Sequence, residues 1–91
     1  MSEMMPGGWT DFSFTITANA KEIFDFALKG LVGVKYTPLA FATQVVAGTN
    51  YCFLSQGKVV YPGAPDLAAK LYICKPLQGD PYIMRIDPVT P

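Results

Sequence analysis

Hydrophobic and polar residues alternate strictly from the eleventh residue, where the chain reads DFSFTIT. Phe12, Phe14 and Ile16 fall on one face of an extended segment, and serine and threonine occupy the other face. A period of two is typical of a strand with one buried face, because successive side chains of a strand point to opposite sides. The pattern therefore predicts a first strand over residues 11–17.

The spacing of the apolar residues then changes from two to about four. Ile23, Ala27 and Leu31 recur every fourth residue, which is the pattern of a helix with one apolar stripe. Asn19 followed by Glu22 has the spacing of a capping box, and Gly30 and Gly33 offer a helix end. The sequence predicts one amphipathic helix that covers a sheet. Its exposed side offers two ion pairs: Lys21–Asp25 and Asp25–Lys29.

The period of two returns at residue 34 and continues almost to the C-terminus. Leu39, Phe41, Thr43 and Val45 share one face, and Pro38 within this run predicts an edge strand or a bulge. Turn residues divide the rest of the chain. A strand is predicted from residue 34 to a turn at Ala47 and Gly48. The next strand covers 49–54, is interrupted at Gly57 and resumes over 58–61. A loop over 61–66, a strand over 68–75, a turn over 76–81 and a last strand over 82–87 follow.

One helix followed by hairpin-connected strands predicts an α+β fold, in which the helix lies on one face of an antiparallel sheet of four to five strands. A chain of 91 residues has the size of a single domain, which we assign to residues 11–91. Residues 1–10 contain Pro6, Gly7 and Gly8 and are expected to form a flexible N-terminal segment.

Charge and composition narrow the class of partner. Seven basic residues balance seven acidic ones without a basic cluster, so we expect neither nucleic acid nor a membrane surface as a partner. The first residues lack the basic and apolar regions of a signal peptide, and no apolar run approaches the length of a membrane span. We therefore expect a cytoplasmic protein.

The residues that usually carry catalysis are scarce. The chain contains no histidine, which removes Ser-His and Cys-His nucleophilic sites and histidine-ligated metals. Glu22 and Asp25 are three residues apart on the predicted helix, where a solvated helix face is favoured over an acid–base pair. Cys52 and Cys74 fit no metal motif, and a hairpin centred on Gly63 would make them cross-strand neighbours with reduced thiols. We expect no enzyme, no metal and no cofactor.

The most specific signal surrounds the predicted turn at Gly48. Gln44-Val45-Val46-Ala47-Gly48 resembles the Q-x-V-x-G motif of the cystatins. The longer string QVVAGTNY is similar to the stefin branch (type 1 cystatins), which is intracellular and lacks disulfides. Met5-Pro6-Gly7-Gly8 resembles the stefin N-terminus, in which Gly7 is the best match and Gly8 the next. The position of the helix before the motif strand also matches the order of that family.

The resemblance implies a cystatin-like fold and a reversible, tight-binding inhibitor of papain-like cysteine proteases. In stefins an N-terminal glycine region, the Q-x-V-x-G hairpin and a second hairpin form a wedge that occludes the active-site cleft without a covalent bond. The second turn departs from that family, because its Leu-Pro stands here in reverse order. Carried over residue by residue, the implied protease-binding residues are Gly7, Gly8, Gln44, Val45, Val46, Ala47, Gly48, Pro76 and Leu77.

Other interpretations of the same residues stay open. Gly48 can serve only the turn of a hairpin, and Trp9 can either contact a protease or pack against the sheet. The reversed Pro76-Leu77 favours a non-inhibitory binding or structural module of the same fold. The expected monomer can also self-associate as a dimer by strand exchange at the first hairpin. A third class is a small-ligand protein, which a cavity of a few hundred cubic ångströms beside the concave sheet face would support.

Overall fold

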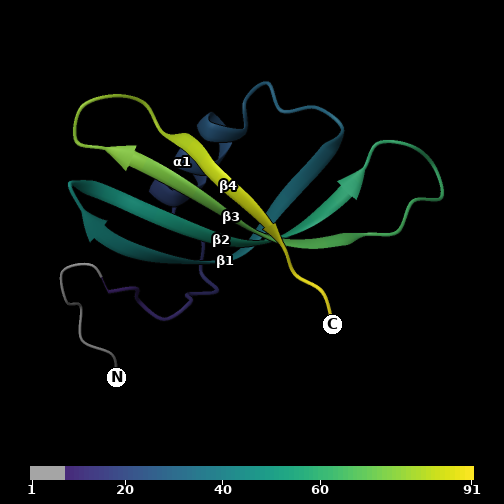
Figure 1. Ribbon diagram of the computed structural model, residues 1–91, viewed down its shortest axis with the longest axis horizontal. Coiled ribbons are helices and arrows are strands. Elements are labelled where there is room, and N and C mark those ends of the chain that lie inside the picture. The colour runs from purple at the N-terminus through teal and green to yellow at the C-terminus, as the bar shows by residue number, and fades with distance from the viewer. Residues whose placement is uncertain (1–7) are drawn as a thin grey trace.

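In the described part of the chain, residues 8–91, one helix lies across one face of a four-stranded antiparallel sheet in the computed structural model (Figure 1). Neighbours in the sequence are neighbours in the sheet, so the strand order is β1-β2-β3-β4. This arrangement confirms the predicted α+β class and is consistent with a cystatin-like fold. The elements are α1 (Ala18–Leu28), β1 (Val34–Val46), β2 (Gly48–Val59), β3 (Leu67–Pro76) and β4 (Tyr82–Pro88).

The core lies between α1 and the middle of the sheet. Ile23 and Phe24 of the predicted stripe are buried, and the Phe24 ring meets the Phe53 ring edge-on with centroids 4.9 Å apart. Phe53 of β2 pairs with Leu71 of β3, so the period of two brings both fully buried side chains to the face under the helix. Truncating a buried phenylalanine costs about 3–5 kcal/mol, which is a large part of the stability of a small domain.

The observed cap of the helix lies two residues before the predicted one. Thr17 is the N-cap, because its backbone is extended and its Oγ1 accepts a hydrogen bond from the Ala20 amide at 3.1 Å. Asn19 lies in the first turn instead. The capping box expected from Asn19 and Glu22 is therefore wrong, because Thr17 occupies the cap position.

One of the two predicted ion pairs on the helix forms. Lys21 Nζ lies 2.8 Å from Asp25 Oδ1, as the four-residue spacing predicts. Lys29 instead places its ammonium 4.3 Å from the centre of the Phe26 ring, and the Asp25–Lys29 pair is not among the ion pairs of residues 8–91. The helix has ended by this point, because Lys29 is its C-cap and leaves the helical conformation.

The first predicted strand, over residues 11–17, is wrong. Residues 9–17 meet β1 at two isolated bridges, Trp9–Gln44 and Ser13–Phe41, and only the second lies within 11–17. Between the two bridges the N-terminal residues advance by four positions, from Trp9 to Ser13, whereas β1 advances by three, from Phe41 to Gln44. The pairing register therefore slips by one residue, and the alternating apolar side chains cannot all point to the core. Phe14 is consequently 73% exposed, whereas Ile16 packs against the core.

The sheet confirms the edge and bulge predicted at Pro38 and corrects the break predicted at Gly57. β1 is an edge strand, and its pairing with β2 shifts register between Pro38 and Ala40. β2 runs without interruption through Gly57, which pairs with Tyr36. A Cβ atom at Gly57 would lie 2.9 Å from the Tyr36 ring, so close packing of that ring accounts for the glycine.

The register of β2 and β3 separates the two cysteines. Cys52 lies opposite Tyr72, and Cys74 lies opposite Asn50, so the predicted cross-strand pairing of the cysteines is wrong. The hairpin is centred near Pro62 rather than Gly63, and this shift moves each partner by two positions. Both thiols are free, and burial raises the pKa of the Cys52 thiol.

Candidate functional site

The first hairpin presents a short apolar tip. Val46 at the end of β1 pairs with Gly48 at the start of β2, and Ala47 alone lies between the two strands. The side chains of Val45 and Val46 are exposed although both are apolar and stiff. Behind the tip, the Asn50 Nδ2 donates a hydrogen bond of 2.9 Å to Gln44 Oε1. The hairpin therefore combines a supported polar base with an uncovered apolar end.

Gly48 is required at this turn for two separate reasons. Its φ of +108° lies in the region that side chains rarely adopt. In addition, a Cβ atom built on Gly48 would lie 2.5 Å from the carbonyl oxygen of Lys75 and 2.9 Å from Cα of Pro76. The positive φ is predictable from the turn alone. The lack of room for a Cβ atom arises from the backbone of the neighbouring hairpin.

The second hairpin lies directly beside the first. Pro76, at the end of β3, pairs with Gly48, and Leu77 follows it with 75% of its surface exposed. Lys75 supports this turn, because its ammonium donates a hydrogen bond of 2.9 Å to the Pro76 carbonyl oxygen. The reversed order of Pro76 and Leu77 thus still presents an apolar side chain next to the first tip.

The described N-terminal residues run beside the motif strand. Gly8 is partly buried, and Trp9 forms an antiparallel bridge with Gln44. Thr10 continues the contact, because its amide donates to the Thr43 carbonyl oxygen at 2.9 Å and its Oγ1 accepts from the Thr43 amide at 3.0 Å. Gly7, the other implied site glycine, lies outside the described residues.

Trp9 packs against the outer face of the sheet. Its ring meets Tyr72 edge-on with centroids 5.8 Å apart. The Arg85 guanidinium carbon lies 3.9 Å from the centre of the same Tyr72 ring, and Asp87 holds Arg85 through a 3.0 Å ion pair. Of the two roles considered for Trp9, packing against the sheet is the one observed, although the ring stays partly exposed.

The three predicted segments meet at one end of the molecule. The bridge from Trp9 to Gln44 joins the N-terminal residues to the first hairpin, and the pairing of Gly48 with Pro76 joins the first hairpin to the second. Figure 1 shows both turns at the same end of the sheet. We call this group, consisting of Gly8, Trp9, 44–48, Pro76 and Leu77, the hairpin end.

Some contacts of the hairpin end cannot be predicted from the sequence. Tyr72 and Arg85 form the platform under Trp9, yet neither belongs to a recognisable pattern with it. Both face Trp9 because of the strand register, in which Tyr72 pairs with Arg85. Pairing registers between distant strands leave no signal in local spacing.

Other candidate chemistry does not assemble in the described chain. Asp25 is engaged by Lys21, which agrees with a solvated helix face rather than an acid–base pair with Glu22. Across residues 8–91, no three metal-ligating side chains come together. The described helix is too short and too polar to cross a membrane.

No family model, no curated protein and no solved structure matches this chain.

Proposed function

We propose that this protein is a reversible, tight-binding inhibitor of papain-like cysteine proteases and resembles the stefins. The observation that carries the proposal is the meeting of the N-terminal residues, the Gln44–Gly48 motif and the Pro76-Leu77 turn at one end of the sheet. These are the three segments that the resemblance to stefins assigns to protease binding. Their pairing in space does not follow from the motif itself, so it supports the proposal independently.

The physical properties of the hairpin end suit insertion into a narrow cleft. The exposed side chains of Val45, Val46 and Leu77 are apolar, and their burial against a protease would remove that surface from water. Gly48 lies so close to the Lys75 carbonyl that the two turns form one preassembled edge. A preassembled edge loses little conformational entropy on binding.

The proposed mode of inhibition is occlusion without a covalent bond. A papain-like cleft binds extended peptides, and exposed backbone at the hairpin tip can form the same type of hydrogen bond. The tip has no free strand end to offer, because Val46 pairs with Gly48 and only Ala47 separates the strands. The protease would therefore be blocked by a closed turn that is a poor substrate.

The experiment is a titration of papain activity with the purified protein and two matched variants. Val46→Asp places a charge on an exposed tip residue, and Val60→Asp makes the same change at an exposed residue far from the tip. We expect stoichiometric inhibition by the wild-type protein and by Val60→Asp. Val46→Asp should weaken inhibition by about a hundredfold, because it buries an unpaired charge at the interface.

Two further variants test the other segments. Leu77→Asp tests the second turn, and a chain that begins at Trp9 tests the N-terminal glycines. Each should weaken papain inhibition while the circular dichroism spectrum stays that of the wild type. Full papain activity at micromolar wild-type protein would overturn the proposal. If the protein that fails to inhibit papain elutes from gel filtration as a folded monomer or dimer, the non-inhibitory module of the same fold would be favoured.

A further inference from the structure

Residues 9–13 form a strap that crosses the edge of β1 from one face of the sheet to the other. Trp9 bridges to Gln44, and Ser13 bridges to Phe41. Phe41 packs against the core under α1, whereas Gln44 lies three positions later in a regular stretch of β1 and therefore on the opposite, outer face. The strap thus begins on the outer face at Trp9 and reaches the side of α1 at Ser13.

Hydrogen bonds at Thr10 and Ser13 hold the strap to the edge of β1. The Thr10 amide donates to the Thr43 carbonyl oxygen at 2.9 Å, and Thr10 Oγ1 accepts from the Thr43 amide at 3.0 Å. Ser13 and Phe41 exchange backbone hydrogen bonds of 2.8 and 2.9 Å. Hydrogen bonds along one edge fix the path of the strap beside β1. Contacts of its side chains with the sheet decide how its N-terminal end lies on the outer face.

Trp9 makes that contact with the outer face. Cys52 alternates with the core residue Phe53, so its side chain points to the outer face, yet it is only 4% exposed. Ala42, which pairs with Cys52, is buried to the same extent. Both residues line a small cavity together with Trp9, so the indole ring covers them. The small side chains beneath the ring make room for it.

Tyr72 supports the Trp9 ring from the side, and Arg85 supports Tyr72. The two rings meet edge-on with centroids 5.8 Å apart, and the Arg85 guanidinium carbon lies 3.9 Å from the centre of the Tyr72 ring. The Asp87 carboxylate lies 3.0 Å from Arg85 Nε and orients the guanidinium. This chain of contacts joins the last strand of the sheet to the N-terminal residues.

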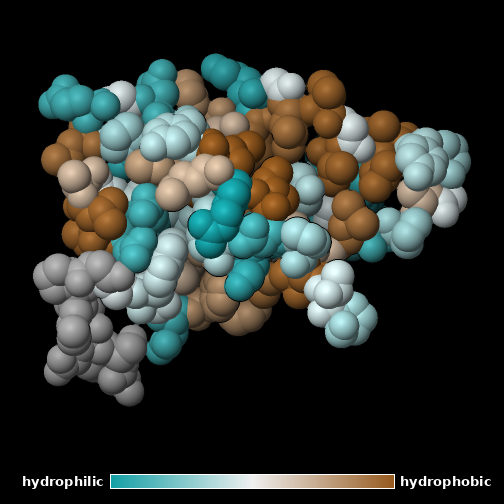
Figure 2. Space-filling model, viewed as in Figure 1, coloured by the Kyte–Doolittle hydropathy of each residue, from teal (hydrophilic) through white to brown (hydrophobic). Residues whose placement is uncertain are grey.

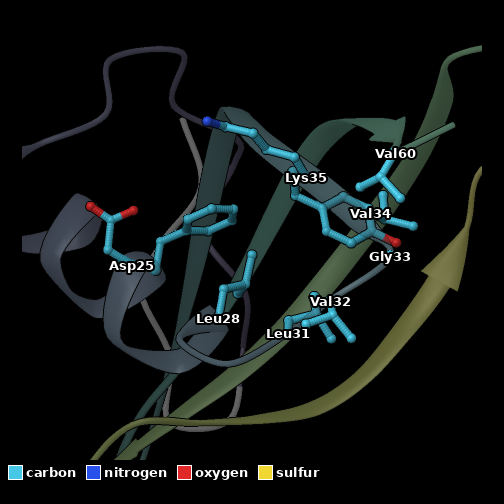
Figure 3. Close-up of a pocket in the computed structure, with 10 residues that line it drawn as sticks. Asp25, Leu28, Leu31, Val32, Gly33, Val34, Lys35 and Val60 are labelled. Atoms are coloured by element: carbon cyan, nitrogen blue, oxygen red, sulfur yellow. The ribbon is translucent and has the colours of Figure 1, made fainter. Parts of the chain in front are cut away.

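The opposite end of β1 stays open in the described chain. An apolar cleft of about 420 Å³ lies there between α1 and the beginning of β1, and Figure 3 shows Leu28, Val32 and Val60 around it. Val32 is 86% exposed. Figure 2 also shows hydrophobic residues gathered at the end of the molecule that lies away from the N-terminus. Apolar side chains face solvent at that end, whereas the strap closes the outer face at the hairpin end.

We propose that Tyr72 and Arg85 are positioning residues for protease binding and act through Trp9. They hold the Trp9 ring on the outer face, which keeps Gly8 beside the first hairpin before a protease arrives. An arrangement that exists before binding loses less entropy on binding. This inference rests on the proposed function, because it gives the residues under Trp9 a part in presenting the N-terminal glycine to a protease.

The test is a double-mutant cycle on the full chain, measured by papain inhibition. Tyr72→Leu and Trp9→Ala should each weaken inhibition about tenfold, which is the loss of one aromatic contact, and Arg85→Met should weaken it about threefold. The double variant Trp9→Ala, Tyr72→Leu should be no weaker than Trp9→Ala, because both changes remove the same contact. Tyr72→Phe keeps the ring and should inhibit like the wild type. Tyr61→Leu, which changes an exposed tyrosine between β2 and β3, is the matched control.

A second readout needs no protease. Trp9 is the only tryptophan of the chain, so its fluorescence reports the contact with Tyr72 directly. Tyr72→Leu and Arg85→Met should shift the emission to longer wavelength, and Tyr61→Leu should not. The Arg85 side chain is exposed, so Arg85→Met keeps the test valid if Tyr72→Leu does not fold.

The outcomes separate this proposal from the proposed function. Additive losses in the cycle, or undiminished papain inhibition by both Tyr72→Leu and Arg85→Met, would overturn the positioning role and leave the proposed function standing. An unchanged Trp9 emission in both variants would also overturn the positioning role. Absence of inhibition by the wild-type protein would overturn both proposals.

Discussion

The two ends of the long β1–β2 hairpin use glycine in opposite ways. At the hairpin end, Gly48 has a positive φ and no room for a Cβ atom, because the backbone of Lys75 and Pro76 lies against it. At the opposite end, where β1 begins and β2 ends, Gly33 and Gly63 also have positive φ, but nothing lies within 4 Å of a built Cβ atom. The first end is therefore held by backbone contact between two turns, whereas the second end is open and exposes apolar side chains.

This difference matches the function that we propose for the hairpin end. A surface that enters the narrow cleft of a protease needs a rigid edge whose shape exists before binding. The strands of the hairpin are long enough to keep its two ends apart.

The largest expected effect comes from adding one methyl group at each end. Gly48→Ala should lower the free energy of unfolding by about 2–4 kcal/mol, because the new Cβ atom collides with backbone and the residue must keep a positive φ. Gly63→Ala should cost only about 1 kcal/mol, because only the backbone conformation is unfavourable there. Urea denaturation of both variants measures the difference. Equal losses would contradict the close contact between the two turns.

A smaller effect is expected at the N-terminus of α1. Thr17→Ala removes the oxygen that accepts from the Ala20 amide and should cost about 1 kcal/mol of stability. Thr15→Ala, an exposed threonine in the same segment, is the matched control and should cost nearly nothing. Thermal unfolding followed by circular dichroism compares the two variants. A larger loss for Thr15→Ala would show that the helix begins elsewhere.

The Trp9 contact predicts a local effect on the thiol beneath it. Cys52 lines a small cavity of about 160 Å³ with Trp9, Phe12 and Tyr72, and burial raises the pKa of its thiol. In a Cys74→Ser background, Trp9→Ala should speed the labelling of Cys52 by a thiol reagent several-fold at neutral pH, because the cover is lost. Phe14→Ala, which removes an exposed ring of the same segment, should leave the labelling rate unchanged.

The smallest expected effect is a loss of folding stability at alkaline pH, which arises from the buried phenol of Tyr51 in β2. Burial raises the pKa of the Tyr51 phenol above its ordinary value of 10.0, and a hydrogen bond with Asn19 partly opposes that shift. The folded state therefore holds the phenol proton more tightly than the unfolded state does. This contribution to stability is complete below pH 10 and is lost as the pH rises through the raised pKa. Tyr51→Phe should show a shallower alkaline fall in melting temperature than the wild type.

Local patterns in the sequence predict the helix and most strands because these depend on spacing within one segment. The stripe containing Ile23 and Phe24 follows from the helical period, and the edge position of β1 follows from Pro38. The positive φ of Gly48 likewise follows from turn chemistry. These features need no knowledge of what lies across the sheet.

The features that escape the sequence depend on contacts between distant segments. The strand expected over 11–17 fails because its register against β1 slips, and the break expected at Gly57 fails because the Tyr36 ring covers that glycine. At the hairpin end, the contact of Gly48 with Lys75 and the platform under Trp9 both depend on strand registers. The helix stripe expected to reach Leu31 is wrong at its end, because α1 ends at Leu28 and Leu31 lies in the connection to β1.

The measurement that tests the central claim most directly is an amide chemical-shift titration of the isotope-labelled protein with chemically inactivated papain. We expect the amides of Trp9, Val46, Gly48 and Leu77 to shift or broaden, while those of Gly33, Val34 and Val60 keep their positions. Such a result would place the protease on the hairpin end alone. Perturbation centred on Gly33, Val34 and Val60, or no perturbation at saturating papain, would contradict the placement of protease binding at the hairpin end.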